Sequence, residues 1–468
     1  MSGTYHVVRR EWQQVARDGR VLATAVLVAL LMAAALVAGL AQSRQWQAET
    51  VAAAVTDTNI WNGQGAVNPH NAAHFGQYAF KPSGALAWFD PGVNDYLGRG
   101  LWMEAHYQNP ASLRPAEEGT SLIRFGTMSG AYVLQIGLPL LILLAGFGSF
   151  ASERESGTLK LQLAAGASMP RIFFGKALAL ASLALLAWLP VSMALFYLTD
   201  DAWRAATAAF GYALYAFIWV GLTLGVSASV REAKAALALL LVIWLATLLV
   251  VPRMAVDVAE KIYPSPNPQT FWADVGEAQK SGIDGHGGKG EREKALLATT
   301  LAQYGVSREQ DLPISFAGIS LQAGEDFGNE VFDRYYGTLW AGYGAQDRVR
   351  AALGLISPLL PIQSLSQAAA GTDWRHHRHF ADAAEAHRRQ LQRFLNGDFT
   401  AQAKGRDFDY KADAALWSRA PRWQYERPQL ATAQPALGWA LGSLFLWALC
   451  AWSVAYRQIR VLLRGGAL

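Results

Sequence analysis

The sequence predicts a membrane protein whose all-α transmembrane domain has six helices, with mixed extracytoplasmic insertions after the first and fifth spans. Hydrophobic residues make up 52% of the chain and charged residues only 16%, a balance that is unusual for a soluble protein. Six uncharged apolar runs reach the length of about 20 residues that a membrane helix needs. Lys and Arg concentrate in alternate connecting segments, as expected of loops on the cytoplasmic side.

The six predicted spans contain no Asp, Glu, Lys or Arg, whereas a core helix of a soluble protein rarely avoids charge over such a length. We interpret the first span as an uncleaved anchor, because it is longer than the apolar core of a signal peptide and lacks a small-residue cleavage site. The spans are residues 21–42, 128–150, 177–198, 205–228, 235–252 and 435–456.

Charge asymmetry predicts the topology. The segments 1–20, 151–176, 229–234 and 457–468 together carry 13 Lys and Arg against 5 Asp and Glu. Because basic residues in short loops are retained in the cytoplasm, we expect both termini on the cytoplasmic side of a bacterial inner membrane. The long segments 43–127 and 253–434 are then extracytoplasmic.

Two segments outside the spans are predicted to form amphipathic helices. Residues 7–18 combine apolar and basic side chains before the first span, which is typical of an interfacial elbow helix within the cytoplasmic segment 1–20. Residues 374–396 place Phe380, His387, Leu391 and Leu395 at helical spacing in the second insertion.

Composition also excludes some classes of function. The net charge is +4, but the basic residues form no single patch, so we expect no nucleic-acid partner. The only cysteine, Cys450, lies in an apolar run and excludes an intramolecular disulfide or a Cys-based metal site. No nucleophile elbow or paired-carboxylate motif stands out, and we expect no catalytic residues.

The most specific motif follows the second span. The chain reads Glu153-Arg154-Glu155 and then, after a serine, Gly157-Thr158-Leu159. Acidic residues directly after a span depart from the usual basic flank, which indicates that they face protein. Gly157 permits a turn, Thr158 can cap the helix that follows, and Leu159 can pack beneath it. A solvated loop is the alternative interpretation.

This motif resembles the cytoplasmic signature of permeases of the ABC-2 type of ABC transporters, in which the segment forms a coupling helix that docks in the ATPase subunit. The resemblance implies two copies of an ABC ATPase subunit and a second permease chain, identical or homologous. It implies that ATP and Mg²⁺ are bound by the ATPase and that this chain holds no cofactor. Consistent with this, the sequence has no phosphate-binding loop ending in Lys-Ser or Lys-Thr.

The large insertions resemble those of a subgroup of bacterial ABC-2 permeases whose external domains have no settled function. The substrate and the direction of transport therefore stay open. Two hypotheses follow from the resemblance. The first is an ATP-driven permease. The second is an ATPase-coupled mechanotransmission or binding module that acts on a periplasmic partner without a continuous substrate path.

A stripe on the fourth span is a candidate translocation path. Tyr212, Tyr215, Trp219 and Thr223 fall on one helical face, and Gln135 adds a polar group in the second span. The alternative is that these side chains pack between helices, because Gly221 and Gly225 already indicate close helix packing nearby.

Histidines raise the question of a metal site. His70 and His74 are spaced i, i+4, and a second group, His376, His377, His379 and His387, lies near acidic residues. We expect no metal, because Pro69 prevents a helix from continuing backwards from His70 and a polar His-Arg-rich helix end is more often solvated.

Overall fold

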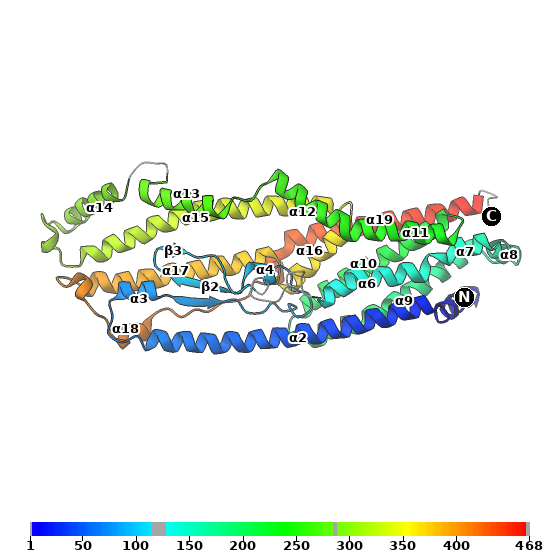
Figure 1. The fold of residues 1–468 in the computed structure, drawn as a ribbon, viewed down its shortest axis with the longest axis horizontal. Coiled ribbons are helices and arrows are strands. Elements are labelled where there is room, and N and C mark those ends of the chain that lie inside the picture. Colours follow the sequence, from blue (N-terminus) through cyan, green and yellow to red (C-terminus); the bar gives the residue numbers. More distant parts are fainter. Residues whose placement is uncertain (1, 115–127, 284–287, 465–468) are drawn as a thin grey trace.

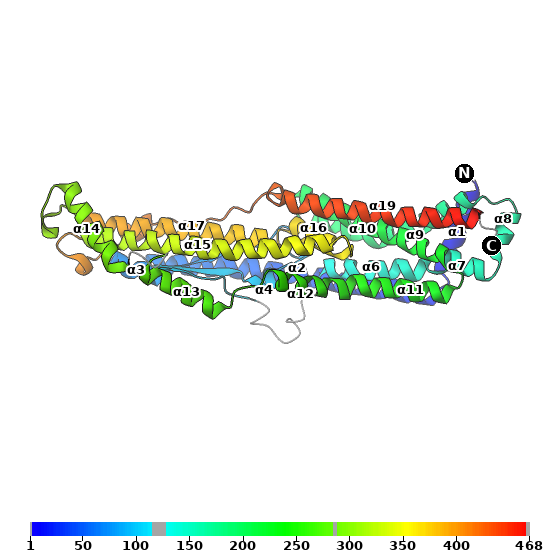
Figure 2. The same cartoon turned by 90° about the horizontal axis from the view of Figure 1, so that it is seen from above.

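The computed structural model describes residues 2–114, 128–283 and 288–464. The molecule is elongated, with a helical bundle at one end and a second part, here called the distal lobe, at the other (Figure 1). The distal lobe comprises the described residues of 43–114, 253–353 and 371–429. Both chain ends and α8 lie at the far end of the bundle (Figures 1 and 2).

The elements have the following bounds. The helices are α1 (Ser2–Val15), α2 (Gly19–Asn62), α3 (Pro69–Phe75), α4 (Asn94–Leu97), α6 (Gly130–Gly146), α7 (Gly148–Glu155), α8 (Thr158–Ala164), α9 (Met169–Tyr197), α10 (Ala202–Ser229), α11 (Ala233–Leu245), α12 (Val251–Ile262), α13 (Pro268–Ser281), α14 (Lys289–Tyr304), α15 (Phe316–Leu353), α16 (Leu359–Ala370), α17 (Trp374–Gln402), α18 (Ala414–Arg419) and α19 (Gln434–Arg464). The strands β1 (Gln77–Phe80), β2 (Gly100–Glu104) and β3 (Tyr107–Gln108) form an antiparallel sheet in that order.

Among the described residues, six helices are long and apolar enough to cross a membrane, and each covers all or nearly all of one predicted span. They are α2, α6 with α7, α9, α10, α11 with α12, and α19. The most buried is α10, which packs against α6, α9 and α19. Outward side chains such as Leu30 and Met193 are apolar and exposed, as expected where helices face lipid. The chain is a multi-pass membrane protein.

The first membrane helix does not end where its apolar run ends. We expected the span to stop at Gln42, but α2 continues to Asn62, a total of 44 residues and about 66 Å at the rise of an α-helix. Residues 43–62 mix polar and apolar side chains but contain no Gly or Pro, so the chain becomes more polar while the helix continues. At its tip the Trp61 indole donates a hydrogen bond of 3.2 Å to the Trp417 carbonyl, which fixes α2 to the distal lobe.

The fifth span also continues beyond its expected end at Pro252. A π-helical turn, Ala246–Val250, directly precedes α12, and Pro252 falls in the first turn of that helix. Proline has no N–H to donate, and the wider turn before it accommodates the ring, while the Thr247 carbonyl accepts from Ser357 Oγ. The helix therefore carries on through Ile262 into the distal lobe.

Residues of the second insertion return into the bundle, which the sequence analysis missed. The helix α16 packs against α10 and α19, and Ile362 and Leu365 are fully buried. The preceding turn is held from both sides: Ser357 Oγ donates to the Thr247 carbonyl at 2.6 Å and Trp447 donates to the Gly354 carbonyl at 2.9 Å. An apolar run of this length is shorter than a membrane span and is typical of such an inserted segment.

The distal lobe is built on two long helices. The predicted amphipathic helix at 374–396 is confirmed as α17, whose apolar face buries Phe380, Leu391 and Leu395. It packs against α15, α3 and β2. Between α15 and α17 the Arg388 side chain is buried and forms ion pairs with Glu325 and Glu385, each at 2.8 Å.

We predict that Gly39→Ala destabilises the protein. Gly39 lies in α2, and a Cβ atom there would come within 2.0 Å of the Trp88 carbonyl oxygen. The chain around Trp88 must move, at a cost of about 1–3 kcal/mol, as for other overpacked sites. Thermal unfolding of the purified protein in detergent measures the effect. The matched control is Gly442→Ala in α19, where no atom lies within 4 Å of the added Cβ. Equal melting temperatures for the two variants would contradict the prediction.

Candidate functional site

The predicted coupling motif lies on α7 and the turn into α8, at the same end of the molecule as both termini (Figures 1 and 2). Ser227 of α10 holds the start of α7: its hydroxyl donates to the Phe147 carbonyl and accepts from the backbone N–H groups of Phe150 and Ala151. Because α7 is fixed to α10 in this way, the motif is positioned by a membrane helix.

Glu153 has its partners within the chain, in place of the partner protein that we expected. Its carboxylate is buried and lies 3.1 Å from Lys176 Nζ of α9 and 3.4 Å from Arg10 Nη2 of α1. Lys176 also pairs with Glu11 of α1 at 2.5 Å. We call Glu11, Glu153 and Lys176 the buried charge cluster. It joins α1, α7 and α9, so in this structure the charge of Glu153 is compensated within the chain.

Arg154 and Glu155 bind the connection between α10 and α11. The Arg154 guanidinium donates to the carbonyls of Ala228 and Val230 at 3.0 and 2.8 Å. The Glu155 carboxylate accepts from the backbone N–H of Ala233 at 3.0 Å, at the start of α11. The positive charge of Arg154 at the end of α10 and the negative charge of Glu155 at the start of α11 each oppose the dipole of that helix, which favours this arrangement. The motif therefore contacts α1, α9, α10 and α11 together.

The rest of the motif forms the turn as expected, with one difference. Gly157 has φ of +72°, a conformation that favours glycine, and Leu159 is fully buried. Thr158, expected as a cap, is instead the first residue of α8, and its hydroxyl lies 2.8 Å from that of Ser156. On the outer side of α8, Leu161 is 70% exposed beside the exposed Lys160. With Ala164, these two side chains are the exposed ones of α8.

The candidate translocation residues are packed in this conformation. Tyr212, Tyr215, Trp219 and Thr223 are fully buried, and Gln135 is buried with them. Gln135 Nε2 donates to the Tyr212 hydroxyl at 2.9 Å, and Tyr215 donates to the Gln135 carbonyl at 3.0 Å. The packing interpretation describes this structure, and a role of these residues in translocation stays a prediction.

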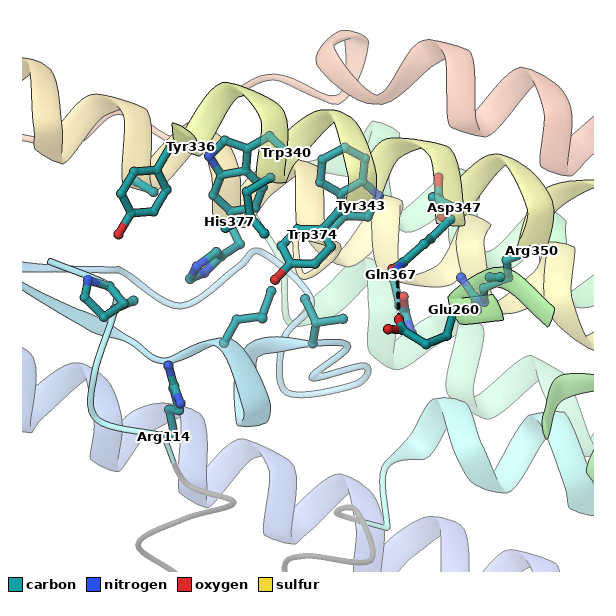
Figure 3. A pocket seen from close by; sticks show the side chains of 18 of the residues that line it. Arg114, Glu260, Tyr336, Trp340, Tyr343, Asp347, Arg350, Gln367, Trp374 and His377 are labelled. Atoms are coloured by element: carbon teal, nitrogen blue, oxygen red, sulfur yellow. Dashed lines mark hydrogen bonds between the residues drawn. The ribbon is translucent and has the colours of Figure 1, made fainter. Parts of the chain in front are cut away.

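A cavity of about 500 Å³ lies where the bundle meets the distal lobe (Figure 3). Its walls come from α12, α15, α17 and the chain around residues 93–114. Four aromatic side chains lie in them, Tyr336, Trp340, Tyr343 and Trp374, with the rings of Trp340 and Trp374 stacked. A cavity of this size with aromatic walls and a few polar groups is typical of a site for a small molecule.

Charged side chains also line this cavity, namely Arg114, Glu260, Asp347 and Arg350, and two buried nitrogen atoms lie in its wall. Within the described part of the chain, neither Trp374 Nε1 nor His377 Nδ1 has a hydrogen-bond partner, although both are buried. Burial, with the positive charges of Lys81 and Arg114, lowers the pKa of His377 to about 3, so the imidazole is neutral. Both atoms have almost no exposed surface, so a bound molecule would meet the charged side chains of the wall before them.

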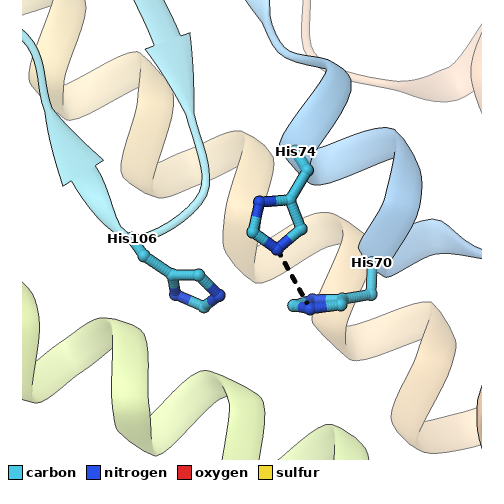
Figure 4. A group of neighbouring side chains, drawn as sticks. All are labelled: His70, His74 and His106. Carbon is cyan, nitrogen blue, oxygen red and sulfur yellow. Dashed lines mark hydrogen bonds between the residues drawn. The ribbon is translucent and has the colours of Figure 1, made fainter.

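The histidines separate into two groups. His70 and His74 lie on α3 and face His106 from the turn between β2 and β3 (Figure 4). Their candidate ligand atoms all lie within 4.8 Å of one another. The expected helix start at Pro69 is confirmed, but it does not separate the two histidines, because α3 begins at that proline and runs forward through both. In the second group, His376 binds Asp373 and His379 binds Tyr425, and no comparable cluster forms there among the described residues.

Comparison with known families finds one match. A family model described as a domain of unknown function (DUF3526) matches residues 269–426. No curated protein matches the chain. The matched region runs from α13 to the chain after α18 and so includes the α15 and α17 walls of the cavity. It contains neither α7 nor α8.

We predict that Lys176→Met destabilises the protein by about 3–5 kcal/mol, because it leaves the carboxylates of Glu11 and Glu153 buried without their shared cation. The control Lys160→Met removes an exposed lysine and should change stability by less than about 0.5 kcal/mol. Adding Glu153→Gln to Lys176→Met should restore part of the loss, since one uncompensated charge disappears. Thermal unfolding of the four proteins tests this, and equal effects of the two lysine substitutions would count against the buried charge cluster.

Proposed function

We propose that this chain is the permease subunit of an ATP-driven ABC transporter of the ABC-2 type and that a separate ATPase subunit docks against α8. The observation that carries the proposal is the position and connectivity of the Glu153-Arg154-Glu155 motif. It lies beside the exposed face of α8, at the end where both termini lie, and it contacts four helices of the bundle. A displacement imposed on α8 would therefore reach α1, α9, α10 and α11.

In this proposal the charged side chains of the motif and the exposed face of α8 have different roles. The three charged side chains transmit the displacement, since their partners lie within the chain. The ATPase would dock on the exposed face of α8. There Leu161 can enter an apolar groove of the ATPase, and Lys160 can pair with acidic residues at the edge of that groove. ATP and Mg²⁺ would be held by the partner, and this chain would perform no chemistry.

The charge asymmetry of the connecting segments supports an orientation with α8 and both termini in the cytoplasm and the distal lobe outside, in a bacterial inner membrane. ABC ATPases work as pairs, so the complex would contain two ATPase chains and two permease chains. Apolar outward faces such as that of α2 are available to lipid or to the second permease chain.

The cavity between the bundle and the distal lobe, from here on called the junction cavity, is the proposed substrate chamber. It lies beside α12, where the fifth membrane helix passes into the distal lobe, and combines aromatic walls with the polar side chains of Glu260, Asp347 and Arg350. These features suit a molecule with an apolar body and one or two hydrogen-bonding groups. Such molecules partition into bilayers, from which the chamber would be reached.

Mechanotransmission is the second candidate function, and α2 favours it. This helix is continuous from the end of the bundle near α7 to Trp61 in the distal lobe. A rigid rod of this kind would carry a cytoplasmic movement to an external partner without any substrate path. The packed state of Tyr212, Tyr215 and Trp219 is consistent with it.

We predict that Leu161→Asp with Lys160→Glu weakens ATPase binding. Loss of one buried apolar anchor costs about 1.5–3 kcal/mol, which is at least about tenfold in affinity. Co-purification of the ATPase with the permease measures this. The control is Tyr304→Asp with Lys289→Glu, which changes two exposed side chains of α14 in the distal lobe. Full co-purification with the α8 variant would show that the ATPase docks elsewhere, and the connection at 229–234 would be examined next.

Flux separates the two candidate functions. In vesicles that contain the chain and its ATPase, we expect ATP-dependent movement of an amphipathic substrate, and Trp340→Ala should reduce this flux by about tenfold or more through loss of an aromatic wall. ATPase co-purification should not change, because Trp340 is remote from α8. ATP hydrolysis that responds to an external partner, without flux in the wild type, would instead favour mechanotransmission.

A further inference from the structure

We propose that His70, His74 and His106 bind a divalent transition metal ion, best matched by Zn²⁺, in the distal lobe. This site is independent of the proposed transport function. Three imidazoles are a common ligand set for Zn²⁺ with one coordination position left open. The two segments that supply them are brought together by the fold: α3 carries His70 and His74, and the β2–β3 turn carries His106 (Figure 4).

The distances suit tetrahedral coordination. The Nε2 atoms of His70 and His74 are 3.2 Å apart, and two nitrogens each about 2.0–2.1 Å from one tetrahedral zinc ion would be about 3.3 Å apart. All three candidate ligand atoms lie within 4.8 Å of one another. Binding of an ion would draw the His106 ring toward the other two. The i, i+4 spacing on one helix places the first two rings on the same face.

A buried carboxylate orients the third ring. Glu325 Oε1 lies 2.7 Å from His106 Nδ1 and accepts a hydrogen bond of 2.8 Å from the His106 backbone N–H. Because Nδ1 is occupied, Nε2 is left to face the other histidines. Glu325 is itself held by Arg388 at 2.8 Å. Carboxylates in this outer position fix the tautomer of metal-binding histidines and increase their basicity.

The backbone of His106 has an unusual conformation, which Glu325 also stabilises. Its φ is +66°, a left-handed conformation that costs free energy for a residue other than glycine. The bond from its N–H to Glu325 stabilises that conformation. Glu325 belongs to α15 and Arg388 to α17, so a bound ion would connect α3 and the β2–β3 turn to the two long helices of the lobe. His74 is exposed, which leaves a route for the ion and an open side for a water molecule.

The experiment uses the full chain without a histidine tag, purified in detergent and stripped with a chelator. Zn²⁺ is titrated in competition with a chromophoric chelator, and bound metal is counted after gel filtration. We expect one ion per chain and an increase in melting temperature on addition of Zn²⁺. Co²⁺ should bind in its place and give the visible absorption of a tetrahedral site.

His74→Ala should weaken Zn²⁺ binding by more than the roughly 10–100-fold that loss of an outer-sphere partner costs. This side chain is exposed, so the metal-free variant should unfold at the wild-type temperature, and Zn²⁺ should no longer raise it. The control His6→Ala removes an exposed histidine of α1 and should bind Zn²⁺ as the wild type does. The proposal is overturned if the wild type binds no Zn²⁺ or if His74→Ala and His106→Ala bind it with unchanged affinity. None of these measurements requires an ATPase.

Discussion

The Arg204 guanidinium joins the membrane bundle to the distal lobe, and the arrangement of both depends on it. Arg204 lies at the start of α10 and is buried. It donates to the carbonyls of Ala368 and Ala369 at the end of α16, each at 3.1 Å, and to that of Pro428 at 2.7 Å. The carbonyls at a helix end lack partners within the helix, and a cation there both satisfies them and opposes the helix dipole.

This contact explains why α16 can sit inside the bundle. A turn and a short helix among membrane helices must have their backbone groups satisfied by protein, because lipid offers no hydrogen bonds. Arg204 donates hydrogen bonds to the carbonyls at the carboxyl end of α16. In the turn before α16, the Ser357 hydroxyl donates to the Thr247 carbonyl, and Trp447 donates to the Gly354 carbonyl. The inserted helix in turn positions the chain on either side of it. The α15 and α17 walls of the junction cavity are therefore fixed relative to the membrane helices.

At the opposite end of the bundle, charged side chains also connect helices to one another. The buried charge cluster joins α1, α7 and α9, and Arg154 and Glu155 bind the connection between α10 and α11. Removing both partners of a buried ion pair can be harmless, whereas removing one is costly, so such clusters hold helices in a defined relation more than they add stability. For the proposed permease, this makes α7 the element that distributes a movement of α8 among the membrane helices.

Much of the fold could be predicted from the sequence because its determinants are local. The six membrane helices follow from runs of uncharged residues, and α17 follows from apolar residues at helical spacing. The turn at Gly157 also follows from one residue and its backbone preference. Lipid imposes the same requirement on every residue of a span, so composition within a short window is enough.

The contacts that define the candidate sites depend on residues far apart in the chain. The sequence showed Glu153 but not Lys176 beside it, and it showed His70 and His74 but not His106, which the β2–β3 turn brings to them. It also could not reveal that α16 inserts beside α10, since the signal is a short apolar run that a soluble core would accept equally well. Whether a side chain is buried, and which side chains form a ligand set, depends on the residues packed around it. The tertiary fold determines which residues those are.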